Sequence, residues 1–169
     1  MVVPSVVIDP ILRNLGQDCT IIKYHVNIGI LEYDVSTYTS KQSRGSLMDR
    51  GANGGIIGSD ALVFHQYKDR FVDVTGIDNH ELNSLPLVDA SALTESNRGP
   101  IIIIMRQYAY HGRNRTLHSC GQLEYFHNKV YDQSMKVGGR QCIVTNDGYI
   151  IPINMKHGLP YIDMRPHTN

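Results

Sequence analysis

The sequence contains no tryptophan, only three phenylalanines and only three cysteines among its 169 residues. The cysteines, Cys19, Cys120 and Cys142, are odd in number and far apart, which excludes a regular disulfide framework. They predict reduced thiols in an intracellular setting. No two histidines have the spacing that places both on one helix face as metal ligands, so neither a metal site nor a cofactor is expected.

Long apolar runs and an excess of one charge are also absent. No apolar segment approaches the ~20 residues of a membrane span. The first ten residues lack the basic segment and apolar core of a secretory signal. Sixteen Lys and Arg residues balance sixteen Asp and Glu residues, so the formal net charge is zero. A neutral chain does not favour nucleic-acid binding through a basic face.

The chain is rich in tyrosine, glycine and short β-prone segments. Ten Tyr, fifteen Gly and seven Pro suit a turn-rich β protein, and 41% hydrophobic residues suffice for a core. The pattern predicts evenly spaced short strands at 61–67, 71–77, 82–90 and 101–105, and a hairpin of 141–145 with 149–153. The five apolar residues at 101–105 predict burial on both faces. Even spacing predicts a mostly β protein, with a closed or partly closed barrel.

One short helix and a division of the chain are also predicted. Apolar residues at helical spacing favour a helix at 120–130, with Ser119 as its N-cap. Residues 1–44 are interpreted as an N-terminal extension or linker with one or two strands at 20–38. Residues 45–169 are interpreted as the folded domain, ending in a tail punctuated by Gly and Pro from Met155 onward.

Asp49 is the leading candidate for a catalytic group. It follows the apolar pair Leu47-Met48 and begins a stretch with four glycines in eight positions, from 51 to 58. Glycine permits positive φ and close backbone approach, so this stretch is neither a regular strand nor a helix. A tight surface loop is the simpler interpretation. The alternative is a turn that presents a catalytic carboxylate, as in acid proteases, whose chemistry needs two such groups sharing one proton.

Two segments resemble those of a known family. Leu47–Ala52 resembles the hydrophobic-hydrophobic-Asp-Ser/Thr-Gly-Ala motif of retropepsin-like aspartic proteases. Leu117–Leu123 resembles the second element of the copia-type version, in which a strand completes the substrate-facing sheet and enters a helix. The stretch from Gly45 to Pro166, about three-quarters of the chain, is similar to polyprotein segments of copia-type retrotransposons from diatoms and other algae.

The resemblance implies a retropepsin-like fold and an aspartic endopeptidase that processes a retrotransposon polyprotein. It implies a homodimer in which each chain supplies Asp49, with peptide segments of its own polyprotein as partners. The expected location is an intracellular, cytoplasmic retrotransposon particle, without cofactor or membrane. The resemblance assigns the substrate-binding turn to Arg50, Gly51, Ala52 and Asn53. It assigns a flap to the hairpin near 74–82, represented by Val74, Thr75, Gly76, Ile77 and Asp78.

Arg50 departs from the family pattern. The family has Ser or Thr at this position, and its hydroxyl braces the two Asp-bearing loops across the dimer axis. Arg50 therefore favours a second hypothesis, a proteolytically inactive structural or self-association module of the polyprotein. A charge buried beside the dyad without a partner is costly, so we expect Arg50 to turn away and donate to a backbone carbonyl of the partner chain.

A third hypothesis is nucleic-acid binding. It rests only on arginines that lie close in sequence to two tyrosines, namely Arg106, Arg113 and Arg115 near Tyr108 and Tyr110. The zero net charge makes this the weakest of the three hypotheses.

Overall fold

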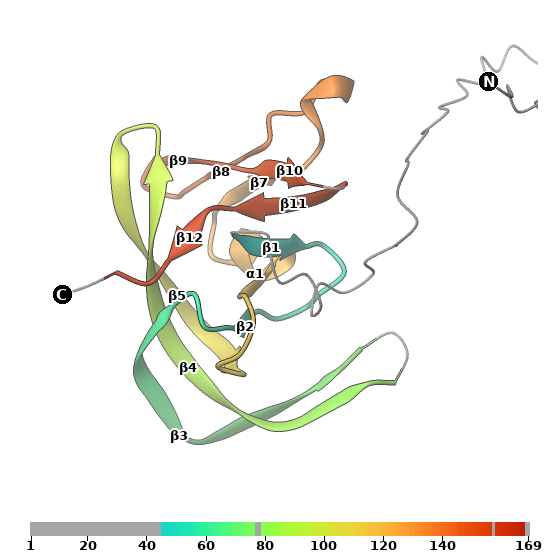
Figure 1. Ribbon diagram of the computed structural model, residues 1–169, viewed down its shortest axis with the longest axis vertical. Coiled ribbons are helices and arrows are strands. Elements are labelled where there is room, and N and C mark those ends of the chain that lie inside the picture. Colours follow the sequence, from blue (N-terminus) through green and yellow to red (C-terminus); the bar gives the residue numbers. More distant parts are fainter. Residues whose placement is uncertain (1–44, 77–78, 157, 168–169) are drawn as a thin grey trace, which may run out of the picture. The chain divides into compact units, whose positions relative to one another are not determined.

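The computed structural model describes residues 45–76, 79–156 and 158–167 (Figure 1). All of them belong to the second of the chain's two units, Asp34–Asn169. The predicted extension at 1–44, with its strands at 20–38, lies outside the described residues. So do Ile77 and Asp78 of the predicted flap.

The described residues form strands for the most part, as the composition predicted, with one short α-helix and one 3-10 helix. The elements in chain order are β1 (Ser46–Asp49), β2 (Ile56–Ile57), β3 (Leu62–Thr75), β4 (Glu81–Ser96), β5 (Gly99–Tyr110), β6 (Leu117–Ser119), α1 (Cys120–Tyr125), β7 (Lys129–Tyr131), η2 (Met135–Val137), β8 (Cys142–Val144), β9 (Ile150–Pro152), β10 (Asn154–Lys156), β11 (Leu159–Ile162) and β12 (Met164–Arg165). No helix in these residues is both long and apolar enough to span a membrane.

The strands of the described residues form two sheets. Nine strands pair in the order β10-β11-β1-β6-β2-β5-β4-β12, with β3 added to β4, and β7, β8 and β9 form a second sheet. In this part of the chain β10 and β12 end the order without pairing to each other. The sheet therefore does not close, and of the predicted closed or partly closed barrel the closed form is not observed. The prediction of a closed barrel rested on evenly spaced short strands, but several of these are parts of longer strands.

The meander β3–β4–β5 shows this merging. β3 spans both predicted strands at 61–67 and 71–77, and its register shifts between Gln66 and Phe71, around Asp69 with φ 55°. β4 pairs with β5 only from Leu87 onward, directly after Pro86, whose missing N–H costs no ladder bond on that side. The part of β4 before Leu87 pairs only with β3, and together they form a two-stranded arm that extends from the rest of the sheet (Figure 1).

Two clusters of buried side chains form the core. One joins β1, α1, the second sheet and β11, through Met48, Cys120, Val130, Ile143, Ile151, Ile153 and Ile162. The other joins β2, β4, β5 and β12, through Ile57, Val88, Ala90, Ala92, Met105, Tyr108 and Met164. Partly buried Ile103 packs against both clusters. Each fully buried Val, Ile or Met side chain of these clusters contributes roughly 1.5–3 kcal/mol.

Two local predictions are confirmed, the helix cap and the C-terminal hairpin, and the predicted end of the helix and the predicted tail need correction. Ser119 is the N-cap of α1, and 142–144 pairs with 150–152 as a hairpin. The helix ends at Tyr125 because His127 has a φ of 64°, and the chain returns as β7. The predicted tail after Met155 instead contributes β10, β11 and β12 to the large sheet.

The apolar run 101–105 is not buried on both faces. Ile102 and Ile104 are 56% and 58% exposed, whereas Met105 is buried and Ile101 and Ile103 are half-buried. Successive side chains of a strand alternate between the two faces of a sheet. Because the core covers only one face of β5 here, the run is apolar on both faces but buried on one.

Candidate active site

The centre of the candidate site is the parallel pairing of β1 with β6. Leu47 lies opposite Leu117, and Asp49 at the end of β1 lies opposite Ser119 at the end of β6. β1 is held on its other edge by β11, which runs antiparallel to it. The two segments quoted for the family resemblance are therefore neighbours in space, and α1 begins directly after Ser119.

The loop after Asp49 is held by the start of α1. The Ser119 hydroxyl donates to the Ala52 carbonyl over 2.6 Å and accepts the Gln122 N–H over 3.1 Å as the helix cap. The Gln122 side-chain oxygen accepts the Gly55 N–H over 2.8 Å, and its amide nitrogen donates to the Arg106 carbonyl over 3.1 Å. One helical turn thus fixes both the loop and its position beside β5.

Glycine is required in this loop for close approach rather than for positive φ. A Cβ at Gly55 would lie 2.0 Å from Cε1 of the buried Tyr108 ring. A Cβ at Gly58 would lie 2.4 Å from the backbone carbon of Arg115. None of the glycines from 51 to 58 has positive φ. The expectation of left-handed conformations here was therefore wrong, and that of close packing is confirmed.

Asp49 itself is half-buried at the edge of this framework. Its Oδ1 accepts the N–H of Gly51 over 2.7 Å, which orients the carboxylate within the turn. Ala52 is half-buried and Asn53 is exposed in the same loop. Asp49, Gly51 and Ala52 therefore lie in one turn at the end of the parallel strands β1 and β6.

Arg50 is paired within its own chain. Its Nε and one terminal nitrogen donate to the two oxygens of Asp132 over 3.0 and 3.1 Å. Both terminal nitrogens reach the Glu124 carboxylate over 3.2 Å, and one lies 3.5 Å from the Val130 carbonyl. The hydrogen bond to Asp132 raises the pKa of Arg50 further and lowers the pKa of Asp132. These acceptors lie on α1, on β7 and at the residue after β7 of its own chain, whereas we expected an acceptor on a partner chain.

Replacement of Arg50 by Thr tests this internal bracing. The guanidinium is about half-exposed, at 49%, so we expect Arg50→Thr to lower the free energy of unfolding by about 1 kcal/mol or less. We expect the Gly51 and Gly55 amides to exchange faster, because the loop loses its link to Asp132. Urea unfolding and amide exchange measure both effects, with Arg113→Thr, in the exposed β5–β6 loop, as the control. Equal amide exchange in Arg50→Thr and wild type would contradict the bracing role.

The predicted flap segment lies at the end of the β3–β4 arm. Val74 pairs with Leu82 and Thr75 pairs with Glu81, and the Gly76 N–H donates to the His80 carbonyl over 2.7 Å. In Figure 1 this end of the arm and the β1–β2 loop both lie toward the right of the view. The segment is therefore a hairpin end, as predicted for 74–82.

His118, on β6 beside the candidate site, is a buried titratable residue to which the sequence analysis gave no role. It lies opposite Met48, is 1% exposed, and its Nδ1 is 3.1 Å from the Tyr108 hydroxyl. Burial lowers the pKa of His118 to about 4, so the ring is neutral near pH 7. Strand alternation was the available signal, because a residue between Leu117 and Ser119 faces away from the Asp49 loop and into the core.

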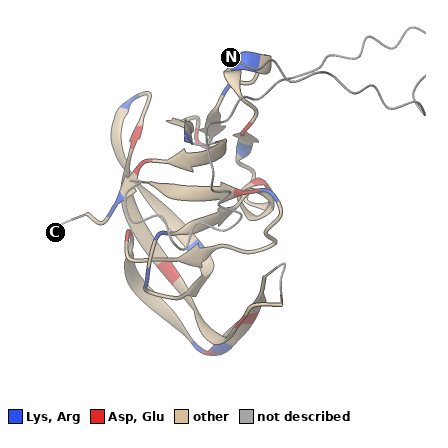
Figure 2. Cartoon of the chain, turned by 45° about the vertical axis from the view of Figure 1, so that its right-hand side comes forward, with Lys and Arg blue, Asp and Glu red and all other residues tan. Residues whose placement is uncertain are grey.

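Two of the arginines proposed for nucleic-acid binding contact other residues of their own chain. Arg106 pairs with Asp89 over 3.1 Å, and Arg115 lies 5.4 Å from the Tyr161 ring centroid, so two arginines of the nucleic-acid hypothesis are engaged. Charges of both signs are interspersed in Figure 2.

Cys120 and Cys142 are free and buried, and burial raises the pKa of the Cys120 thiol to about 11. No cluster of three potential metal ligands occurs among the described residues.

No protein-family model matches this chain, and neither a curated protein nor a solved structure matches it significantly.

Proposed function

We propose that this chain is an aspartic endopeptidase that processes a retrotransposon polyprotein and acts as a homodimer, with Asp49 of each chain forming the catalytic pair. The observation that supports this most is the framework of Asp49. Asp49 is the last residue of β1 and lies opposite Ser119 of the parallel strand β6. The loop after Asp49 is hydrogen-bonded by Ser119 and Gln122, which belong to the segment that joins β6 to α1. Ser119 and Ala52 are 67 residues apart in sequence, so this contact belongs to the fold rather than to a local turn.

The proposed chemistry needs two carboxylates in different protonation states. One Asp49, ionised, takes a proton from the attacking water as general base. The Asp49 of the second chain, protonated, donates a hydrogen bond to the scissile carbonyl. Two like charges within hydrogen-bond reach do not ionise together, so the pair shares one proton. This mechanism needs no cofactor.

The proposed substrate is an extended segment of the polyprotein to which the chain belongs. It lies between the active-site loop, formed by Arg50, Gly51, Ala52 and Asn53, and the end of the β3–β4 arm at 74–76. An extended peptide offers backbone N–H and C=O groups to both elements, as in other peptide recognition by strand addition. The proposed location is the retrotransposon particle in the cytoplasm.

Dependence on concentration tests the proposed dimer. Each chain supplies half of the site, so we expect peptide cleavage per chain to fall about tenfold for each tenfold dilution below the dimer dissociation constant. Sedimentation over the same concentrations gives the fraction of dimer, and the two curves should coincide. A folded chain that remains monomeric at micromolar concentration and still cleaves would exclude the shared site.

A second candidate function is a proteolytically inactive retropepsin-like module for self-association. The observation that favours it is Arg50, whose donors are bound to Asp132, Glu124 and Val130 of its own chain instead of bracing a second chain. A stable dimer that cleaves none of the polyprotein junctions between pH 4 and 7 would favour this function over the protease.

A further inference from the structure

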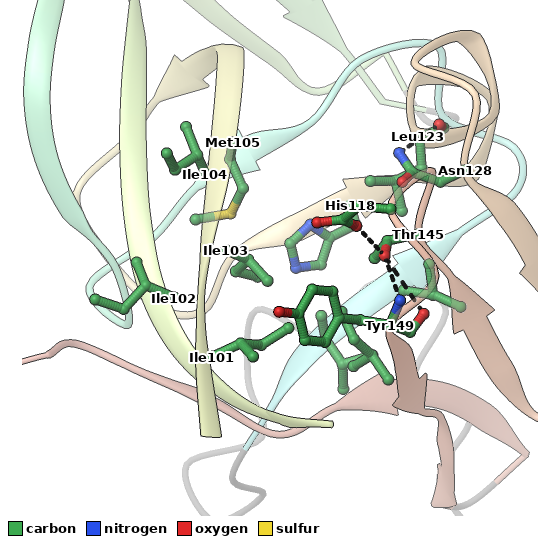
Figure 3. A pocket seen from close by; sticks show the side chains of 14 residues that line it. Ile101, Ile102, Ile103, Ile104, Met105, His118, Leu123, Asn128, Thr145 and Tyr149 are labelled. Carbon is green, nitrogen blue, oxygen red and sulfur yellow. Dashed lines mark hydrogen bonds between the residues drawn. The ribbon is translucent and has the colours of Figure 1, made fainter. Parts of the chain in front are cut away.

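One edge of β5 carries no neighbouring strand before Ala109 in the described part of the chain. β4 pairs with the other edge from Gly99 to Ala109, whereas β2 pairs with this edge only at Ala109 and Tyr110. All five residues of the run 101–105 line one cavity of about 530 Å³ (Figure 3). Successive side chains of a strand lie on opposite faces of a sheet. Because residues of both faces line the same cavity, the unpaired edge of β5 itself faces it.

The backbone groups of Ile102 and Ile104 point toward this unpaired edge. The Arg106 carbonyl accepts the side-chain amide of Gln122 over 3.1 Å, so it points away from β4. The backbone groups of alternate residues in a strand share one direction, which gives Ile104 and Ile102 the same orientation as Arg106. Pro100 belongs to the same alternating set, and its missing N–H costs no ladder bond on an unpaired edge. Two N–H and two C=O groups therefore face the cavity.

The wall opposite β5 runs from α1 to the β8–β9 hairpin. α1 lies near the Arg106 end of β5, where Gln122 binds the Arg106 carbonyl. The hairpin lies near the Ile101 end, because the N–H of Asn97, just before β5, donates to the Ile150 carbonyl over 2.9 Å. The aliphatic part of this wall is formed by Leu123, Ile143 and Ile151.

Asp147 in the turn of the hairpin gives the Ile101 end of the cavity a negative charge. Its Oδ1 accepts the Thr145 hydroxyl, and its other oxygen has no hydrogen-bond partner among the described residues. No Lys or Arg side chain from those residues lines the cavity. Arg98 stacks over the Tyr149 ring at 4.9 Å from its centroid, and within the described structure it forms no ion pair with Asp147. This end of the cavity is therefore complementary to a cationic side chain.

We propose that the unpaired edge of β5 binds an extended segment of another polypeptide chain, which adds to the sheet as an antiparallel strand of about five residues. The segment has apolar side chains at its first and third residues and Lys or Arg at its fifth, which reaches Asp147. No residue of the loop 49–55 lines this cavity. The site is separate from the proposed peptidase chemistry, and it stands or falls independently of it.

The register follows from the free backbone groups. The second and fourth residues of the segment lie opposite Ile104 and Ile102 and exchange N–H···O=C hydrogen bonds with them. Figure 3 shows Ile102 and Ile104 on one side of β5 and Ile101 and Ile103 on the other. The first, third and fifth side chains of the segment share the side of Ile101 and Ile103 and face the aliphatic wall. The antiparallel direction brings the fifth residue to the Ile101 end, where the hairpin turn lies.

The probe is the peptide Val-Thr-Val-Thr-Lys, acetylated and amidated at its ends and titrated into the full chain under NMR observation. We expect saturable shifts of the Ile102 and Ile104 amide signals, and hydrogen exchange at both amides at least about tenfold slower in the complex. N-methylation of both threonines removes the two donors that face β5, and should weaken binding about fivefold to a hundredfold. N-methylation of the central valine, whose N–H points away from β5, is the control and should leave binding near that of the parent peptide.

Replacement of Asp147 by Asn tests the cationic end of the segment. Asn-Gly suits a hairpin turn as Asp-Gly does, so the fold should remain, which thermal unfolding checks. Wild type should bind the Lys peptide about twofold to fivefold more tightly than the same peptide ending in Gln, and Asp147→Asn should bind the two equally. A preference for Lys that persists in Asp147→Asn would overturn the assigned direction. The proposal as a whole would be overturned by the absence of saturable shifts at millimolar peptide, or by equal binding of the parent and the doubly N-methylated peptide.

Discussion

Asp49→Asn is expected to lower peptide cleavage by about a hundredfold to ten-thousandfold, the range that a general acid–base pair contributes. The substitution leaves no ionisable group at the end of β1 in either chain of the proposed dimer. The fold should remain, because the Asn side-chain oxygen still accepts the Gly51 N–H that Asp49 accepts over 2.7 Å. Cleavage of a polyprotein junction peptide, with thermal unfolding measured beside it, gives both quantities.

A matched control is Asp163→Asn, which changes an exposed carboxylate that pairs with Lys156 over 3.7 Å. Exposed pairs of this kind contribute little, so cleavage and stability should both stay near wild type. If Asp49→Asn cleaves at the wild-type rate while folded, the catalytic group lies elsewhere in the chain.

The second large effect expected is a loss of stability in mild acid caused by His118. The folded-state pKa of this buried ring is about 4, against 6.5 when it is exposed. Above pH 6.5 both states are neutral and His118 adds no pH dependence. Between pH 6.5 and 4 the unfolded chain takes up a proton that the folded chain excludes, so stability falls, by ~3 kcal/mol in total at pH 4 and below.

Urea unfolding from pH 7.5 to 4 measures this loss. In the double variant His118→Phe with Tyr108→Phe the decline between pH 6.5 and 4 should disappear. The carboxylates of Asp132 and Asp60 also have shifted pKa values, but they affect stability differently from His118 as the pH falls. Asp132 has a pKa lowered by Arg50, so its contribution is lost only at more acidic pH. Asp60 has a pKa raised by burial, so its protonation in the folded state favours folding as the pH falls. An unchanged decline in the double variant would show that another group causes it.

Local features of the fold follow from the sequence because their signals are local. Ser119 caps a helix because its hydroxyl reaches the N–H three residues ahead, and Asp147-Gly148 turns a hairpin because glycine adopts the positive φ of 85° found there. The mostly β character follows from the abundance of turn residues and β-prone runs. The role of Asp49 came from a short motif, and it remains a proposal.

Tertiary structure decided the features that join distant segments. The sequence does not show that β11 borders β1, that β3 is one long strand, or that the sheet formed by the described residues stays open. The reason is that strand partners are chosen by burial over long separations. For the same reason it could not reveal that Arg50 binds Glu124 and Asp132, 74 and 82 residues away. His118 acquires its low pKa and its unsatisfied Nε2 only because β6 is inserted between β1 and β2, where packing removes water from a ring that is ordinary in sequence.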